Sequence, residues 1–310
     1  MTYSDVSILN VGAGSCTVIE SPSGRRSMID INDAGDLREA AAMSSVDRLV
    51  REGSLAPMRA KLTDPIAFCR ANGINELWRY IQSHPDADHM AGLRRILRGE
   101  LSVMNFWDIP HSRVRSGRSE FQNDAAYEDW QAYRALRNGT LANAPQLLNP
   151  LRGHANHYWV DDDIEILSPT PSLIADCEAA DVYNNASYVL RVKHGPSAVL
   201  LPGDIEEKGW NDMIAAGVDI SADVLVASHH GRNSGYSATA MEYINPSVVI
   251  ISTDQLDPAH DAEAEYRKWT KYVYSTRREG NLWVRMHDGG GFEVHSHAGK
   301  LTGFVRSYAS

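Results

Sequence analysis

The chain has 310 residues, of which 43% are hydrophobic and 23% charged, so composition excludes a disordered or fibrous protein. Its 30 Lys and Arg against 40 Asp and Glu give a formal charge of −10, and no general attraction to DNA or anionic lipid is expected. No apolar run approaches the roughly 20 residues of a membrane helix, and the first residues do not resemble a signal peptide. Three isolated cysteines, Cys16, Cys69 and Cys177, are typical of a reducing compartment. These features predict a cytoplasmic protein without a membrane partner.

Strands and helices alternate along most of the chain. In the first hundred residues, apolar patterns and turn residues predict strands over 6–11, 16–20, 27–31 and 77–83, with helices over 36–51, 64–71 and 90–97. The stretch 102–158 is irregular apart from a helix over 124–137. Beyond it the pattern predicts strands over 164–167, 187–193, 197–201, 223–228 and 247–251, with helices over 205–215 and 261–271.

This order of elements predicts an α/β (α+β) fold. Strands near both ends with helices between them suggest two mixed β-sheets that pack together and are covered by helices, because each sheet needs both faces buried. No internal repeat or low-complexity linker is present. We therefore expect a single domain over residues 1–310, with an insertion at about 102–158.

The most informative motif is Ser83-His84-Pro85-Asp86-Ala87-Asp88-His89, between a predicted strand and a predicted helix. Four of six consecutive positions can ligate a metal, and a tight loop can direct alternate side chains into one pocket. His84 and Asp86 could then serve one ion, and Asp88 and His89 a second. The alternative is a polar loop whose Asp caps the following helix.

Two later strands also end in ligand-type side chains. Leu201-Pro202-Gly203-Asp204 follows one of them, and Ser228-His229-His230-Gly231 follows the next. Taken alone, each is more often a turn or a capping feature. Because α/β sheets place their sites at the carboxyl ends of strands, these residues and the His84 motif together predict a two-metal site.

Six motifs in order resemble the metallo-β-lactamase superfamily, and within it the soluble hydrolase domain of the DNA-uptake competence protein ComEC. They are Val11-Gly12-Ala13-Gly14-Ser15, Met28-Ile29-Asp30, His84-Pro85-Asp86-Ala87-Asp88-His89, Asn184-Asn185-Ala186-Ser187, Leu201-Pro202-Gly203-Asp204 and His229-His230-Gly231. His260, Tyr274-Ser275-Thr276 and Gly280 also look like that subgroup. The resemblance covers most of the chain except about 37–60 and 102–158. It implies an αββα sandwich and a metal-dependent hydrolase of the phosphodiesterase or nuclease kind.

The resemblance also implies a ligand set. Asp86 stands where the commoner superfamily pattern has a second His, as in the subgroup, and Asn184, Asn185 and Ser187 lie where a third His motif is usual. The first metal position is therefore rich in oxygen, so the two divalent ions are expected to be Zn²⁺ or Mn²⁺. Asp204 would bridge them, with a hydroxide between the ions as the nucleophile. Asp30, Asn184, Asn185 and Ser187 are expected to support the ligands without binding metal. Asp30 would hold a ligand by a hydrogen bond, although it could equally be a loop cap.

The adjacent His229 and His230 leave a choice open. Adjacent residues leaving a strand usually point to opposite faces, so one should bind metal while the other contacts substrate or donates a proton to the leaving group. Of the two, we take His229 as the ligand. His260 resembles a late active-site His of the subgroup, but a lone His before a helix is more often a helix-start residue.

The segment 102–158 contains a basic cluster formed by Arg113, Arg115 and Arg118, with aromatic residues around it. Arginine beside aromatic rings suits a lid that binds phosphate and base. The alternative is a solvated basic loop over a packed helix.

The sequence thus predicts a metal-dependent hydrolase, either a phosphodiesterase or a nuclease, with nucleic acid or a nucleotide as the substrate class. Its expected catalytic residues are Asp88, Asp204, His230 and His260, and its expected metal ligands are His84, Asp86, Asp88, His89, Asp204, His229 and His230. One alternative is a hydrolase of a small ester, lactone or amide, because the same bimetal centre can serve all of these. The other is a binding module that keeps its metal site for structure.

Overall fold

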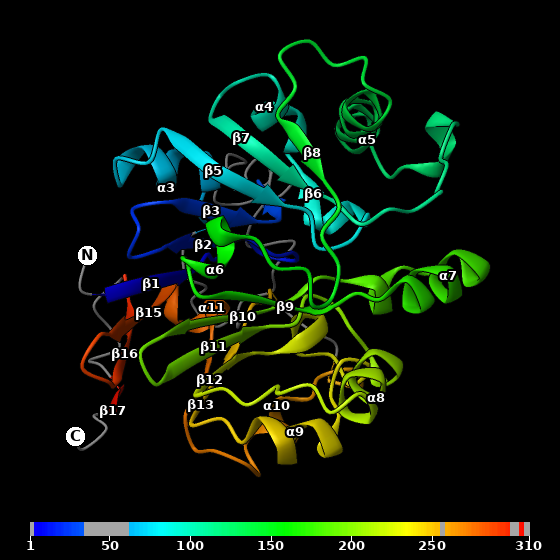
Figure 1. Cartoon of the computed structure of the whole chain (residues 1–310). Helices are drawn as coiled ribbons and strands as arrows, with labels where there is room; N and C mark the ends of the chain where they lie inside the picture. Colours follow the sequence, from blue (N-terminus) through cyan, green and yellow to red (C-terminus); the bar gives the residue numbers. More distant parts are fainter. Residues whose placement is uncertain (1–2, 34–61, 255–257, 298–303, 307–310) are drawn as a thin grey trace, which may run out of the picture.

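The computed structural model describes residues 3–33, 62–254, 258–297 and 304–306. In this part of the chain, two large β-sheets lie face to face, with helices over their outer sides (Figure 1). Both sheets contain parallel and antiparallel strands. The predicted α/β sandwich of two mixed sheets is confirmed. The helix predicted over 36–51 lies outside the described residues.

The larger sheet has, within the described residues, the strand order β17-β16-β15-β1-β2-β3-β5-β7-β8. Its strands are β1 (Tyr3–Ile8), β2 (Thr17–Glu20), β3 (Arg26–Ile29), β5 (Glu76–Ile81), β7 (Ser102–Trp107), β8 (Gln146–Leu148), β15 (Leu282–His287), β16 (Phe292–Ser296) and β17 (Phe304–Arg306). From β3 to β8 neighbouring strands run parallel, so β3, β5 and β7 all end at the same edge.

The smaller sheet has the order β14-β13-β12-β11-β10-β9 among the described residues. Its strands are β9 (Ile164–Ser168), β10 (Val189–His194), β11 (Ser197–Leu201), β12 (Val224–Val226), β13 (Val248–Ile251) and β14 (Val273–Ser275). The strands β11 to β14 are parallel. A short third sheet pairs β4 (Ile31–Asn32) with β6 (Met90–Ala91).

The helices of the described chain are mostly short. They are α3 (Pro65–Ala71), α4 (Leu93–Leu97), α5 (Asp124–Arg137), α6 (His157–Val160), α7 (Pro171–Ala180), α8 (Glu207–Ala215), α9 (Ala238–Ile244), α10 (Glu263–Tyr266) and α11 (Thr276–Glu279). Single 3₁₀ turns are η1 (Ala87–His89), η2 (Arg118–Glu120), η3 (Asn184–Ala186) and η4 (Ser228–Gly231).

Three apolar layers hold these elements together. Between the sheets, β1 and β15 bury alternate residues such as Val6 and Val284 against Val192 and Val224 of the smaller sheet. Helices α3, α4 and α5 cover the outer face of the larger sheet, and α8, α9 and α10 cover that of the smaller one. The smaller sheet and the β3–β7 part of the larger sheet are therefore covered on both faces, whereas β1, β15 and β16 bury alternate residues only.

Several predicted bounds need correction. The helix predicted over 90–97 begins at Leu93, because Met90 and Ala91 pair with β4 and Gly92 has φ 99°, which a helix cannot hold. The helix predicted over 261–271 is limited to α10, after which Trp269 N–H bonds back to the Tyr266 carbonyl in a tighter turn. The stretch 102–158 contributes β7 and β8 to the edge of the larger sheet, and α5 packs on that sheet.

The segment that follows β7 is held by a network of buried polar side chains. His111 Nε2 lies 2.8 Å from the Tyr133 hydroxyl, which donates to Asp108 at 2.6 Å, and Arg137 contacts both His111 and Asp108. Burial, followed by the charges of Arg137 and Arg113, lowers the pKa of His111 to about 3. His111 is therefore neutral, and it anchors the segment that continues to Arg113.

Candidate metal centre

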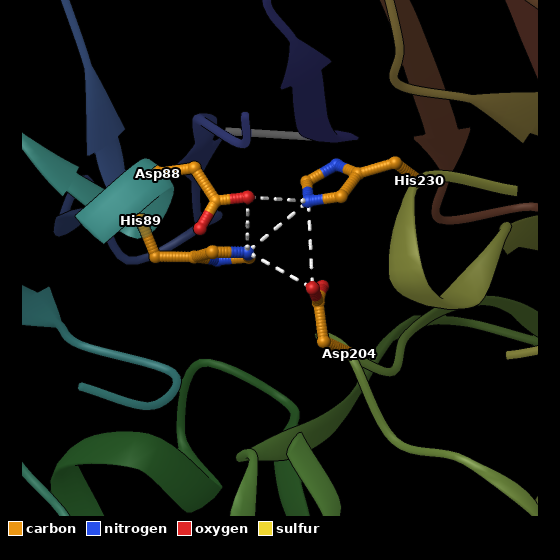
Figure 2. A group of neighbouring side chains, drawn as sticks. All are labelled: Asp88, His89, Asp204 and His230. Carbon is orange, nitrogen blue, oxygen red and sulfur yellow. Dashed lines mark hydrogen bonds and ion pairs between the residues drawn. The ribbon is translucent and has the colours of Figure 1, made fainter. Parts of the chain in front are cut away.

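Four side chains from loops of both sheets meet at one edge of the sandwich. Asp88 and His89 follow β5, Asp204 follows β11, and His230 follows β12. One ligand atom from each residue lies within 4.8 Å of the others (Figure 2). His89 Nε2 is 3.2 Å from Asp204 Oδ2 and 3.2 Å from His230 Nε2, and His230 Nε2 is 3.4 Å from both Asp88 Oδ2 and Asp204 Oδ2. We call these residues the tetrad.

Asp30 fixes the orientation of His89. Asp30 is fully buried between β3 and β4, and its Oδ2 accepts from His89 Nδ1 at 2.7 Å. The same carboxylate accepts from the Ser83 backbone N–H at 2.7 Å and from the Ser83 hydroxyl at 2.6 Å. A carboxylate accepts and does not donate, so Nδ1 of a neutral His89 carries the proton and Nε2 presents its lone pair to the tetrad.

The same logic holds for two other buried histidines at the site. His230 Nδ1 lies 3.2 Å from the Ser252 carbonyl, which can only accept. His84 Nδ1 lies 3.1 Å from Ser83 Oγ, whose own proton goes to Asp30. His84 Nε2 is buried and has no hydrogen-bond partner. Each neutral imidazole thus directs a bare Nε2 towards the site, as in histidines whose tautomer is set by an outer hydrogen bond.

With both histidines neutral and both aspartates ionised, the tetrad carries an excess of negative charge. Burial disfavours the charged form of His89, yet Asp204, Asp30 and Asp88 outweigh it and raise the pKa of His89 well above its ordinary value. Burial also opposes charging of His230, but Asp204 and Asp88 raise its pKa to about 9. Against the effect of burial, His89 and His230 hold the pKa of Asp204 well below its usual range. The tetrad therefore attracts positive charge, which protons supply when no other cation is bound.

The donor set of the tetrad fits a divalent metal ion. Two carboxylates and two imidazoles converge with their lone pairs, and imidazole and carboxylate are the ligands that Zn²⁺ and Mn²⁺ use. The orphaned His84 Nε2 is a further buried donor beside them, because the His84 and His89 ring centroids are 4.3 Å apart. The arrangement fits a metal-dependent hydrolase.

Two expected ligands, His84 and Asp86, form a second pair next to the tetrad. His84 Nε2 lies 3.6 Å from Asp86 Oδ2. Asp86 is partly exposed, and its Oδ1 forms an ion pair with Arg113. The structure therefore brings His84, Asp86, Asp88 and His89 to one site, as the motif predicts.

His230 joins the tetrad, whereas its neighbour His229 lies at the margin. His229 Nδ1 contacts Ser234 Oγ at 2.8 Å and Glu206 Oε1 at 3.3 Å, and its Nε2 is 3.8 Å from Asp204 Oδ2. Both histidines have left-handed backbone, with φ 50° and 58°. The extended alternation on which we chose His229 as the ligand does not apply to such a turn, so both rings stay on the side of Asp204.

The loop that carries Asp204 is held by the motif at residues 184–187. Ser187 Oγ accepts from the Asp204 N–H at 3.2 Å, and Asn185 Oδ1 accepts from the N–H groups of Glu206 and Gly209. Asn184 Nδ2 donates to Glu206 Oε1 at 3.3 Å. Gly203 has φ 58°, and a Cβ there would lie 2.9 Å from Ser187 Cβ. These residues hold the loop that positions Asp204.

Sequence reasoning missed several residues that hold the site. Asn32 Nδ2 donates to the carbonyls of Ala13 and Asp88, at 3.0 and 3.1 Å, and so ties the glycine turn to the ligand loop. A Cβ at Gly14 would lie 2.5 Å from the Asp88 carbonyl oxygen, which explains the glycine. The position of Asn32, two residues after Asp30, was the available signal. Nothing in the sequence pointed to Ser252 or Glu206.

The expected substrate-binding arginines do not form one open cluster. Arg113 pairs with Asp86, Arg118 pairs with Asp124, and Arg115 lies over the Phe121 ring at 5.9 Å. His260 is exposed, and its carbonyl accepts from the Asn233 N–H at 2.9 Å. The structure does not bring the His260 side chain into the tetrad.

In the described residues, no helix has the length and apolar character needed to cross a membrane. No family model matches the chain. Solved structures to which it is similar include the metallo-β-lactamase fold protein YhfI from Bacillus subtilis, with 11% identity, a TM-score of 0.42 and coverage of 89% of this chain and 98% of that one. A diphosphatase from the PhnP family also has 11% identity and a TM-score of 0.42, with coverage of 90% and 96%.

Curated relatives match about two thirds of the chain. It is 28% identical over 197 residues to ComE operon protein 3 of Bacillus subtilis, which is 63% of this chain and 22% of that protein. It is 25% identical over 198 residues to competence protein ComA of Neisseria gonorrhoeae, again 63% and 22%. It is 28% identical over 208 residues to recombination protein 2 of Haemophilus influenzae, or 67% and 21%. The chain thus spans about a fifth of the length of these relatives. The resemblance to competence proteins that the motifs indicated is confirmed.

Proposed function

We propose that this chain hydrolyses phosphodiesters with two bound divalent ions, Zn²⁺ or Mn²⁺. The observation that carries the proposal is the convergence of ligand atoms from His89, His230, Asp88 and Asp204, with the His84–Asp86 pair beside them. Six ligand groups are enough for two ions that share a bridging carboxylate, and Asp204, which faces both His89 and His230, is the proposed bridge.

The residues around these ligands would prepare the site for chemistry. When bound, divalent ions lower the pKa of water, orient it for attack and neutralise charge that develops on phosphoryl oxygens. Asp30 and the Ser252 carbonyl hold the protons of His89 and His230 on Nδ1, which keeps both Nε2 atoms free for metal. His229 is held by Ser234 and Glu206 at the margin, where we propose that it contacts the substrate.

The names of the relatives support a nucleic-acid or nucleotide substrate. Competence and recombination are processes that act on DNA, although this chain spans about a fifth of the proteins that carry those names. Because the net charge of the chain is −10, a nucleic acid would be bound by positive groups close to the site and not by a general attraction to the protein. The three cysteines are unpaired and buried, which supports a reducing compartment, the cytoplasm. Recovery of the protein in a membrane or secreted fraction would contradict that location.

A second candidate is hydrolysis of a small ester, lactone or amide. Two of the three arginines expected to bind phosphate are already in ion pairs, Arg113 with Asp86 and Arg118 with Asp124, and this favours the second candidate. A substrate without phosphate needs no such cluster.

Activity measured across metals and substrates separates the candidates. The metal-free protein is loaded with Zn²⁺ or Mn²⁺ and assayed on single-stranded DNA, duplex DNA, RNA, cyclic dinucleotides, an aryl phosphodiester, an aryl ester and a lactone. We expect turnover of phosphodiesters that needs metal and disappears in Asp204→Asn. Turnover of the ester or lactone alone would favour the second candidate. A protein that binds no metal, or hydrolyses nothing in any metal, would overturn both.

A further inference from the structure

Arg113 is a buried cation in direct contact with the ligand loop. It lies in the connection from β7 to α5, inside the stretch 102–158 that the family motifs do not cover, and its side chain is only 7% exposed. Its Nη1 donates to the Pro85 carbonyl at 2.9 Å and forms an ion pair with Asp86 Oδ1. One guanidinium nitrogen therefore holds both the backbone and the side chain of the loop that carries the ligands.

This contact leaves the other oxygen of Asp86 directed at the site. Oδ1 faces Arg113, whereas Oδ2 lies 3.6 Å from the unpartnered Nε2 of His84. One oxygen of the Asp86 carboxylate thus pairs with the Arg113 guanidinium, and the other faces the His84 imidazole. Outer hydrogen bonds of this kind orient ligand carboxylates in metal sites.

Arg113 is itself fixed from the other side of the sandwich. Its guanidinium lies over the Tyr183 ring, 4.9 Å from the centroid, and its Nε is 3.5 Å from Asp181 Oδ1. Its backbone N–H donates to His111 Nδ1 at 3.0 Å. Tyr183 directly precedes the stretch 184–187, which holds the Asp204 loop. Arg113 therefore connects the loops that supply ligands from both sheets.

We infer that Arg113 is a positioning residue that holds Asp86 in the orientation needed to bind the second of the two ions, together with His84. The inference rests on the proposed function. It gives Arg113 a role different from phosphate binding, because its Nη1 is already used in the contacts with Pro85 and Asp86. Lysine cannot reproduce this, since a single ammonium lacks the planar fork that stacks on Tyr183 while it pairs with Asp86.

Calorimetric titration of the metal-free protein with Mn²⁺ tests this role without an activity measurement. The wild type should bind two ions. In Arg113→Ala we expect one of the two affinities to fall about 10- to 100-fold, the range typical for loss of an outer partner, with the other unchanged. Arg113→Lys should give an intermediate loss and guards against a variant that does not fold. Arg285→Ala, which removes another arginine–aspartate pair, on β1 and β15, is the matched control and should bind both ions normally.

A double-mutant cycle separates positioning from contact with substrate. In an Asp86→Asn background, Arg113→Ala should weaken the second ion little further, because Arg113 acts through Asp86. In steady-state assays Arg113→Ala should lower kcat at limiting metal and leave KM unchanged, whereas loss of a substrate contact would raise KM. The inference would be overturned if Arg113→Ala and Arg113→Lys bound each of the two ions as tightly as the wild type does. It would also be overturned if the losses of metal affinity in the double-mutant cycle were fully additive. Failure of the proposed function would be seen instead in the wild type, as absent metal or absent turnover.

Discussion

Asp30→Asn is the most direct test of how the site is prepared for metal. Asp30 is fully buried, is not one of the four residues of the tetrad, and has φ 57°. Asparagine has the same shape and tolerates this left-handed conformation nearly as well as aspartate does. The substitution therefore changes hydrogen bonding and charge while it leaves the backbone and the packing in place.

The amide cannot satisfy all four donors that now face Asp30. Oδ1 accepts from the N–H of Ser83 and from Gln82 Nε2, and Oδ2 accepts from the Ser83 hydroxyl and from His89 Nδ1. If the NH₂ group faces His89, Nδ1 must accept and its proton moves to Nε2, the atom that faces Asp204. If it faces the other way, two N–H groups meet in a buried space. We expect metal affinity to fall about 10- to 100-fold, or roughly 1.4–2.8 kcal/mol.

Calorimetry with Zn²⁺ or Mn²⁺ measures this loss, and urea unfolding of the metal-free protein measures the accompanying loss of stability, about 1–3 kcal/mol for an unsatisfied buried group. Asp5→Asn is the control, because Asp5 also accepts two hydrogen bonds, from Arg285 on β15, and has no contact with the tetrad. If Asp30→Asn binds metal as tightly as the wild type, then His89 does not depend on Asp30 for its tautomer, and the reasoning is wrong.

Three further outcomes are expected. Asp88→Asn should lose metal and turnover but keep its circular dichroism spectrum, because the side chain is 47% exposed and supports no core packing. His230→Gln should lose metal, whereas His229→Gln should keep metal and lose rate; elemental analysis of both variants decides between them. Burial, then Arg137 and Arg113, lowers the pKa of His111 in the folded state to about 3, so the unfolded chain binds more protons below pH 6.5. The contribution of His111 to the free energy of unfolding should therefore fall by up to about 2 kcal/mol from pH 7 to pH 5. The difference in free energy of unfolding between the wild type and His111→Gln, measured by urea titration at both pH values, should change by that amount.

The sequence was informative where local pattern and chemistry coincide. Strands β9 and β11 and helix α5 lie where apolar periodicity predicted them, within a residue at each end. Periodicity could not show that β15 pairs with β1 across most of the chain, since pairing of distant strands depends on the whole sheet. It also failed at Gly92, where a left-handed glycine separates β6 from α4.

Ligand types could be predicted for a similar reason. Parallel strands of one sheet end at the same edge, so the polar residues after β11 and β12, Asp204 and His230, were expected to meet. His89 follows β5 of the larger sheet, and the packing of the two sheets brings it to the same place. The partners that orient them come from elsewhere in the chain. Ser252 and Glu206 are ordinary residues in sequence, and only the packing of the two sheets makes them hydrogen-bond partners of His230 and His229.

The turn at His229 and His230 shows why the alternation of side chains along a strand does not describe these two residues. Two consecutive left-handed residues other than glycine cost roughly 1–2 kcal/mol each, so the surrounding structure must hold them. It does so with hydrogen bonds from the His229 N–H to the Gly203 carbonyl at 3.1 Å and from the Ala262 N–H to the Gly231 carbonyl at 2.9 Å. The first of these bonds joins the histidine turn to the loop of Asp204. The strained backbone thus places both imidazoles beside one carboxylate, an arrangement that an extended strand end, with its alternating side chains, could not produce.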